Sequence, residues 1–163
     1  MRITRRTLLA AAAVLPAACG FELRRAPELR FKTVALSGFG PNSLLAAELR
    51  DSIAASRTTQ VVESPLQAQV VLESLTDNRE KSVVASTAAG QVRELQLRSR
   101  FKFRLRTPAG RELIPETEIL LSRDLSYSET AALAKEQEEA FLYRAMQGDI
   151  VAQVMRRLAS VAL

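Results

Sequence analysis

ELQLRSRFKFRLR, residues 94–106, is the stretch that decides the fold. Its apolar side chains alternate with polar or charged ones, and only Ser99 interrupts the apolar series. A period of two over this length is typical of a β-strand with one face in a core and the other in water, as in antiparallel sheets. The polar positions carry five cations, which are Arg98, Arg100, Lys102, Arg104 and Arg106.

Residues 107–110, TPAG, have the composition of a turn, so the strand is expected to pair with residues 111–127. A loop at 108–110 predicts one register that satisfies charge and packing together. In that register the facing pairs are Arg106 and Glu112, Lys102 and Glu116, Arg100 and Glu118, Leu105 and Leu113, and Leu97 and Leu121. Arg98 and Arg104 are then left without an acidic partner in the hairpin.

The remaining pattern predicts strands at 31–37 and 68–87 and a possible short strand at 58–63. A helix of about fifteen residues is expected after a cap at Asn42, with Leu45, Leu49 and Ile53 on its buried face. A long final helix is expected to start at Ser126 or Ser128. Its predicted buried side includes Leu133, Phe141, Ala145, Ala152 and Met155, joined by Leu142, Val151 and Leu158.

One-sided strands together with two amphipathic helices predict an α+β fold. We expect a two-layer sandwich in which a mostly antiparallel sheet of four strands, or five, carries both helices on one face. The other face of that sheet is expected to remain polar.

The N-terminal residues have the pattern of a lipoprotein signal. Three arginines precede an apolar run at 8–15, and Pro16-Ala17-Ala18 leads to Cys19, the single cysteine. A secretory signal of this form is removed and is too short to span a bilayer. A lone cysteine in an exported chain cannot form an internal disulfide. A buried helix with a core cysteine is the alternative, but the alanine-rich run has no polar face.

We therefore expect residues 1–18 to be a signal peptide that is removed after export by the Sec or the twin-arginine route. Cys19 is expected to carry covalent lipid, including palmitate, and to anchor the chain in a membrane. Residues 19–30 are expected to form an exposed lipidated linker, and residues 31–163 a single domain.

Composition excludes several classes of chemistry. The chain has no His and no Trp, which removes histidine metal sites and Ser/His triads. The segment GFGP at 38–41 lacks the spacing and the lysine of a phosphate-binding loop. The net charge of +5 includes three arginines in residues 1–18, so the rest of the chain carries +2. A non-enzymatic binding, assembly or structural protein is predicted, with no cofactor apart from the lipid on Cys19.

No nucleic-acid partner is expected either. Nucleic-acid-binding surfaces combine basic and aromatic side chains. In residues 94–106, however, Phe101 and Phe103 point to the face opposite the cations.

Several stretches, taken in order, resemble the lipopolysaccharide-assembly lipoprotein family LptE, also called RlpB. They are CGFELR at 19–24, FKTVALS at 31–37, residues 42–50, residues 90–97, YSETAALAKE at 127–136, and residues 146–158. The resemblance implies the two-layer fold and a periplasm-facing protein of the outer membrane. It also implies that the protein forms a plug in the LptD β-barrel, assists assembly of that barrel and contacts lipopolysaccharide. The alternative is a stand-alone lipoprotein scaffold or chaperone without a barrel partner.

The resemblance implies a lipopolysaccharide contact at Lys135, near the start of the final helix. Ala88 stands where the family has a second basic residue, and Arg93 is close enough in sequence to substitute for it. Arg98 and Arg104 are further candidates, because arginine matches the geometry of phosphate groups. The alternative for this basic row is a solvated face that the glutamates of the partner strand neutralise.

Overall fold

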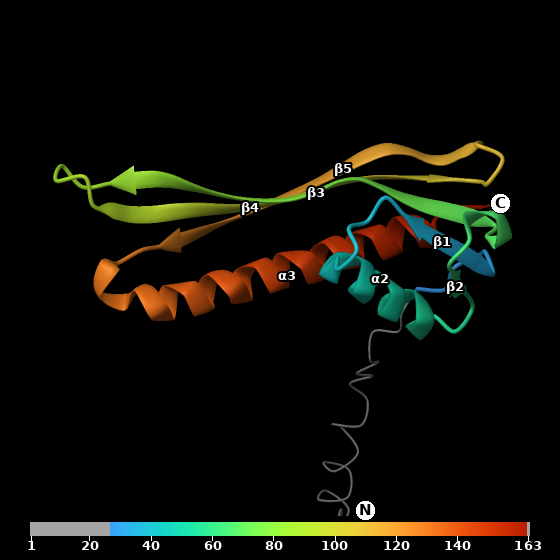
Figure 1. Cartoon of the computed structure of the whole chain (residues 1–163), viewed down its shortest axis with the longest axis horizontal. Helices are drawn as coiled ribbons and strands as arrows, with labels where there is room; N and C mark the ends of the chain where they lie inside the picture. The colour runs from blue at the N-terminus through green and yellow to red at the C-terminus, as the bar shows by residue number, and fades with distance from the viewer. Residues whose placement is uncertain (1–26, 163) are drawn as a thin grey trace, which may run out of the picture.

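The computed structural model describes residues 27–162, so the predicted signal peptide, Cys19 and most of the predicted linker lie outside the described residues. Figure 1 shows an elongated molecule with a sheet on one side and both helices on the other. Its elements are β1 (Thr33–Ser37), α2 (Leu44–Ala55), β2 (Gln60–Val62), η2 (Pro65–Gln67), β3 (Val70–Ser86), β4 (Val92–Arg106), β5 (Glu112–Ser126), η3 (Glu129–Ala131) and α3 (Ala132–Ala159). The predicted α+β class is confirmed.

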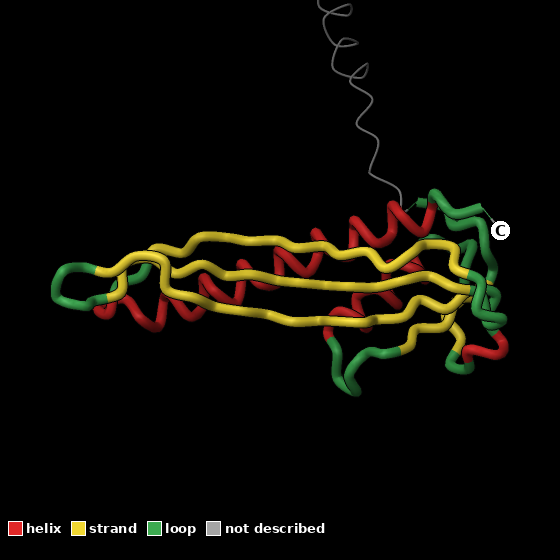
Figure 2. Tube along the Cα trace, turned by 90° about the horizontal axis from the view of Figure 1, so that it is seen from above, coloured by secondary structure: helices red, strands yellow, loops and turns green. Residues whose placement is uncertain are grey.

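The sheet is open and has five strands in the order β2-β1-β3-β4-β5. β1 runs parallel to both β2 and β3, whereas the pairs β3–β4 and β4–β5 are antiparallel. The last three strands contain 17, 15 and 15 residues, so they extend about 50 Å at 3.3 Å per residue. They lie side by side above α3 (Figure 2).

The two ends of the molecule differ. We call the end with the 107–110 turn, the start of β1 and the C-terminus of α3 the base. The opposite end, with the 87–91 turn and the start of α3, is the tip. The first described residues belong to the base: the Leu29 N–H donates to Thr58 Oγ1 over 3.3 Å, and Leu29 is only 5% exposed. The prediction that the exposed linker continues to Arg30 is therefore wrong at Leu29, because this side chain packs in the core.

The alternating pattern of residues 94–106 forms β4, as predicted. Its apolar positions are buried, and so is Ser99. Towards the base they join a core completed by Leu45, Leu49 and Ile53 of α2 and by the last turns of α3. Towards the tip, Leu95 and Leu97 pack with Leu125 and Met146 in a smaller cluster. α3 therefore binds the sheet along most of its length.

The predicted buried face of α3 is wrong at Leu133 and Phe141, which are 72% and 62% exposed, and at Ala145, which is exposed as well. The buried residues of this helix are Met146, Ile150, Val151, Val154, Met155 and Leu158. When the line of buried residues is continued toward the N-terminus of the helix in steps of three and four residues, it passes through the partly buried Tyr143, Glu139 and Lys135. Near the tip, the helix therefore faces the sheet with polar residues. In that half of the helix, Leu133 and Phe141 face the solvent.

The predicted hairpin register holds only next to the turn, where Arg106 pairs with Glu112. Irregularities between Phe103 and Arg106 then shift the pairing by two residues. The observed partners are Leu105 and Ile114, Phe103 and Thr117, Lys102 and Glu118, Arg100 and Leu120, and Leu97 and Arg123. Pro115 lies in the shifted segment and has no N–H for the ladder. A shift of two keeps each side chain on its predicted face.

The predicted helix starts also need correction. Ser43, not Asn42, caps α2, because its Oγ accepts a hydrogen bond from the Ala46 N–H over 3.2 Å. The helix has 12 residues instead of about fifteen. At the last helix, Ser128 precedes η3 without a side-chain cap, and Ser126 Oγ instead accepts from Lys135 Nζ.

Candidate functional site

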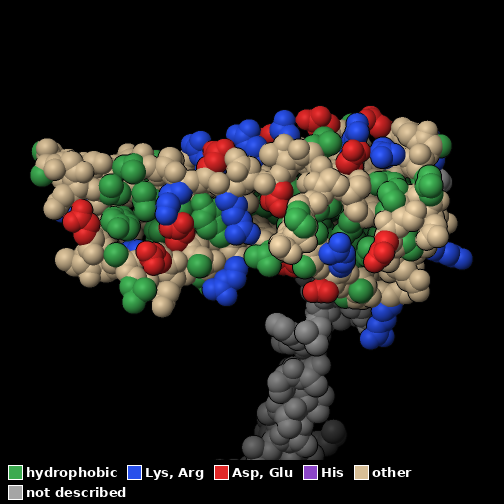
Figure 3. Space-filling model, in the orientation of Figure 1, with side chains coloured by type: hydrophobic (Ala, Val, Ile, Leu, Met, Phe, Trp, Pro, Cys, Tyr) green, Lys and Arg blue, Asp and Glu red, His purple; other side chains and the backbone are tan. Residues whose placement is uncertain are grey.

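The outer face of the sheet, which no helix covers, carries the basic row of β4. In Figure 3 this face is the upper edge, where Lys and Arg side chains are interspersed with Asp and Glu. Arg104 Nε and Arg106 Nε both donate to Glu73 Oε2, over 2.8 and 3.1 Å. Arg104 has no acidic partner in the hairpin, as predicted, but it is not free, because Glu73 of β3 binds it.

Glu73 is the centre of this arrangement. The hydrogen bonds from Arg104 and then from Arg106 hold the pKa of its carboxyl below the ordinary value of 4.5. The same hydrogen bond raises the pKa of Arg104. Two guanidinium groups share one carboxylate, so this triad keeps one net positive charge on the outer face.

The other cations of the row differ in their pairing. Lys102 Nζ lies 3.4 Å from Glu116 and 3.5 Å from Glu118, so two carboxylates neutralise it. Arg98 Nε donates to Gln96 Oε1 over 2.8 Å and makes no ion pair with a carboxylate of residues 27–162. Arg100 Nε is buried and has no hydrogen-bond partner in the same range. Arg98 is thus the exposed cation of this face that remains available to an anion.

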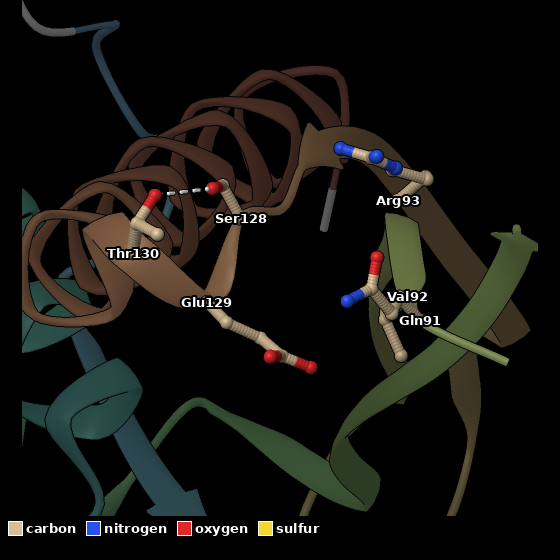
Figure 4. Close-up of a pocket in the computed structure, with 6 residues that line it drawn as sticks. All are labelled: Gln91, Val92, Arg93, Ser128, Glu129 and Thr130. Atoms are coloured by element: carbon tan, nitrogen blue, oxygen red, sulfur yellow. Dashed lines mark hydrogen bonds between the residues drawn. The ribbon is translucent and has the colours of Figure 1, made fainter. Parts of the chain in front are cut away.

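A second group of candidate residues lies at the tip, on the helix side of the sheet. A cavity of about 290 Å³ lies between the start of β4 and the segment that enters α3. It is lined by Gln91, Val92, Arg93, Ser128, Glu129 and Thr130 (Figure 4). In that view the guanidinium of Arg93 lies at the rim of the cavity, and the Glu129 carboxylate extends toward the Gln91 amide.

The backbone joins the two walls of this cavity, because the Tyr127 N–H donates to the Arg93 carbonyl over 2.8 Å. Lys135 follows one turn into α3, and its side chain is 19% exposed. Its Nζ donates to Ser126 Oγ over 3.0 Å and to Glu138 Oε2 over 2.8 Å. Lys135 therefore closes the junction between β5 and α3, while Arg93 makes no ion pair with residues 27–162.

The structure thus separates the four candidate residues into two groups. Arg93 lies at the tip, where it lines the cavity between the start of β4 and the segment that enters α3. Arg98 and Arg104 have the parity opposite to the buried Leu95 and Leu97 and lie on the outer face. Arg93 and Lys135 lie together at the tip, but they do not share a surface with the other two.

Glu73 was not among the residues predicted for this face. Its signal was present, because β3 and β4 are joined by a short turn at 87–91 and pair along their whole length. Aligning these two strands about that turn places Ser74 opposite Arg104, one position from Glu73, and a register shift between Ser74 and Thr76 brings Glu73 into its place. The predicted pairing used only β5 as the neighbour of β4, whereas β4 also pairs with β3.

Two features are absent from residues 27–162. No group of three His, Cys, Asp or Glu side chains is arranged to hold a metal ion there. Over the same residues, no helix has the length and apolar composition needed to cross a membrane.

Comparisons with known proteins agree with the fold. A family model described as LptE, Lipopolysaccharide-assembly, matches residues 31–158. An NMR structure of an uncharacterized lipoprotein B from Nitrosomonas europaea is 31% identical in sequence, with a TM-score of 0.72. The alignment covers 86% of this chain and 91% of that one. A search of curated proteins found no match.

Two more distant crystal structures support the fold alone. The rare lipoprotein B from Shewanella oneidensis is 22% identical, with a TM-score of 0.67, and the alignment covers 79% of this chain and 95% of that one. A minor lipoprotein from Acinetobacter baumannii is 18% identical, with a TM-score of 0.66 and coverage of 83% and 98%.

Proposed function

The chain belongs to the LptE lipopolysaccharide-assembly family, and from that premise we propose that it is a lipid-anchored outer-membrane protein facing the periplasm. It forms a plug in the LptD β-barrel, assists the assembly of that barrel and contacts lipopolysaccharide during delivery to the outer leaflet. The observation that carries this proposal is the family match over residues 31–158. We assign the protein no catalytic step and no cofactor other than the lipid.

The shape of the protein supports the role of a plug. One sheet face is free of helices and polar, and the body is narrow and about 50 Å long, from strands of 15 to 17 residues. A polar outer face suits contact with water, sugar and phosphate in a lumen. The anchor in this proposal is Cys19 after removal of residues 1–18, and the intact mass of the protein tests it through the added acyl chains.

The tip cavity is the proposed first contact for lipopolysaccharide. Phosphate groups and acidic sugars need cations, and the Arg93 guanidinium can donate two parallel hydrogen bonds to one phosphate. Lys135 supplies a second charge at the same junction, although Glu138 partly compensates it. On the outer face, Arg98 is the stronger candidate and Arg104 the weaker, because Glu73 already binds Arg104.

Binding of lipopolysaccharide by single variants of the full chain tests these assignments. Arg93→Ala, Lys135→Ala and Arg98→Ala are each expected to weaken binding about tenfold or more, the equivalent of one charge-assisted hydrogen bond of about 1.5 kcal/mol. Arg104→Ala is expected to have a smaller effect. Arg123→Ala is the matched control, because this exposed cation is paired with Asp149 over 3.2 Å. Unchanged affinity in all four candidate variants would remove lipopolysaccharide contact from the proposal.

A further inference from the structure

We propose that the base of the molecule docks directly on an anionic phospholipid surface. The docking surface, here called the base surface, consists of one exposed leucine and five cations: Leu66, Arg30, Lys32, Arg57, Arg111 and Arg156. It lies at the opposite end of the molecule from the tip cavity and is separate from the proposed lipopolysaccharide contacts.

Leu66 provides the apolar part of the base surface. It lies in η2 between β2 and β3, and at 87% it is the most exposed large hydrophobic side chain of residues 27–162. The neighbouring backbone holds this turn in place, because the Lys32 N–H donates to Gln69 Oε1 over 2.6 Å. A single exposed leucine is common on soluble proteins, so Leu66 alone does not indicate a membrane-binding surface. The charged residues at the same end of the molecule supply the second feature.

Five cations lie at the same end of the molecule as this leucine. Arg30, Lys32, Arg57, Arg111 and Arg156 are all exposed, and none makes an ion pair with a carboxylate of residues 27–162. Figure 3 shows Lys and Arg side chains projecting from this end of the molecule. Arg157 is excluded, because its guanidinium lies 5.9 Å from the centroid of the Phe103 ring.

Carboxylates at the base do not cancel this charge. Glu28, Glu63 and Glu112 lie in the same segments, and Asp51 lines a cavity with Arg50 and Arg57; the five cations of the base surface together with Arg50 still outnumber these four carboxylates. The triad of Glu73 with two arginines adds a further positive charge near the same end. An exposed apolar side chain among unpaired cations is the composition that proteins use to bind anionic membrane surfaces.

The path of the chain brings the base to a membrane. Eight residues, Cys19 to Ala26, precede the first described residue, Pro27. A fully extended chain spans at most about 3.5 Å per residue, which limits this connection to about 28 Å. This step rests on the proposed lipid on Cys19. This connection keeps the base near the bilayer. The tip lies about 50 Å further along the strands, so the connection does not hold it at the bilayer.

Tryptophan substitution gives a direct test, because the chain contains no native Trp. The full-length protein carrying Leu66→Trp is mixed with vesicles of phosphatidylethanolamine and phosphatidylglycerol, and with vesicles that lack the anionic lipid. We expect a blue shift of the emission, and quenching by brominated acyl chains, on the anionic vesicles only. Leu133→Trp is the matched control, because Leu133 is 72% exposed at the tip.

Charge reversal separates docking from simple tethering. A basic residue near an anionic surface strengthens binding about fivefold. Lys32→Glu with Arg57→Glu, in the Leu66→Trp protein, is therefore expected to lower the docking equilibrium about 25-fold or more. Arg144→Glu, which changes an exposed cation on α3 away from the base, is expected to leave it unchanged.

Two results would overturn the proposal. One is an emission spectrum of the Leu66→Trp protein that stays the same on anionic and neutral vesicles. The other is an equal response from the Leu133→Trp protein. The vesicles contain neither LptD nor lipopolysaccharide, so this outcome is independent of the binding series that tests the proposed function.

Discussion

Replacing Gly38 by alanine is expected to destabilise the protein strongly, because two independent costs meet at this position. Gly38 follows β1 with φ at +76°, a region that residues with a side chain rarely adopt. A Cβ atom there would overlap the carbonyl oxygen of Ser74 in β3. The backbone strain costs about 1–3 kcal/mol, and forcing the two strands apart costs about 1–3 kcal/mol more.

The expected loss in the free energy of unfolding is therefore about 2–6 kcal/mol, a large share of the roughly 5–15 kcal/mol that is typical of domains. Gly110→Ala is the matched control, since Gly110 has φ at +92° but nothing within 4 Å of the added Cβ. Urea unfolding followed by circular dichroism measures both variants. We expect Gly110→Ala to lose only the strain component. Equal losses in the two variants would refute the close approach of β1 and β3 as a separate cost.

Two further predictions concern the outer face and the last helix. Glu73→Gln is expected to lower stability at neutral pH by about 1 kcal/mol, since both ion pairs are partly exposed. Because the pKa of Glu73 is lowered in the folded state, this contribution is present above its ordinary value of 4.5 and is lost as the pH falls through the folded pKa. The difference between wild type and variant should therefore shrink in an acid unfolding series as the carboxyl of Glu73 becomes protonated, and a difference that is independent of pH would contradict the triad. Gly148→Ala is expected to raise the thermal stability by about 0.5–1 kcal/mol, because the added Cβ has room 3.5 Å from Glu48 Oε1, and a lower melting temperature would contradict that packing.

The fold was predictable wherever one strong periodicity governed a segment. The alternation in residues 94–106 predicted β4, its buried face and the polar outer face. The register of the hairpin was predictable only next to the turn, because alternation is unchanged by a shift of two residues. The irregularity around Pro115 introduces such a shift, and charge pairing alone did not reveal it.

The face of α3 was predictable only where its apolar residues meet the wide part of the sheet. Leu133 and Phe141 continue an apolar pattern, but in the half of the helix near the tip the residues that face the sheet are Lys135, Glu139 and Tyr143. Lys81 Nζ binds Glu139 over 2.9 Å, so polar contacts replace apolar packing in this half of the helix. Polar contacts of this kind cannot be predicted from the pattern of hydropathy along the sequence.

The candidate residues were predictable as a set of cations but not as a site. Arg93 and Lys135 lie 42 positions apart in the sequence and come to the same end of the molecule because β5 delivers the chain to the tip. Arg104 was expected to be free, since the partner strand of the hairpin offers it no acid. Its partner Glu73 comes from the strand on the other side.

Isolation of the protein from native outer membranes in mild detergent tests the central proposal most directly. We predict that the full chain co-purifies with LptD in a stable complex and that lipopolysaccharide accompanies it. Recovery of the lipoprotein by itself, under conditions that leave LptD folded and present in the same extract, would contradict the proposed plug.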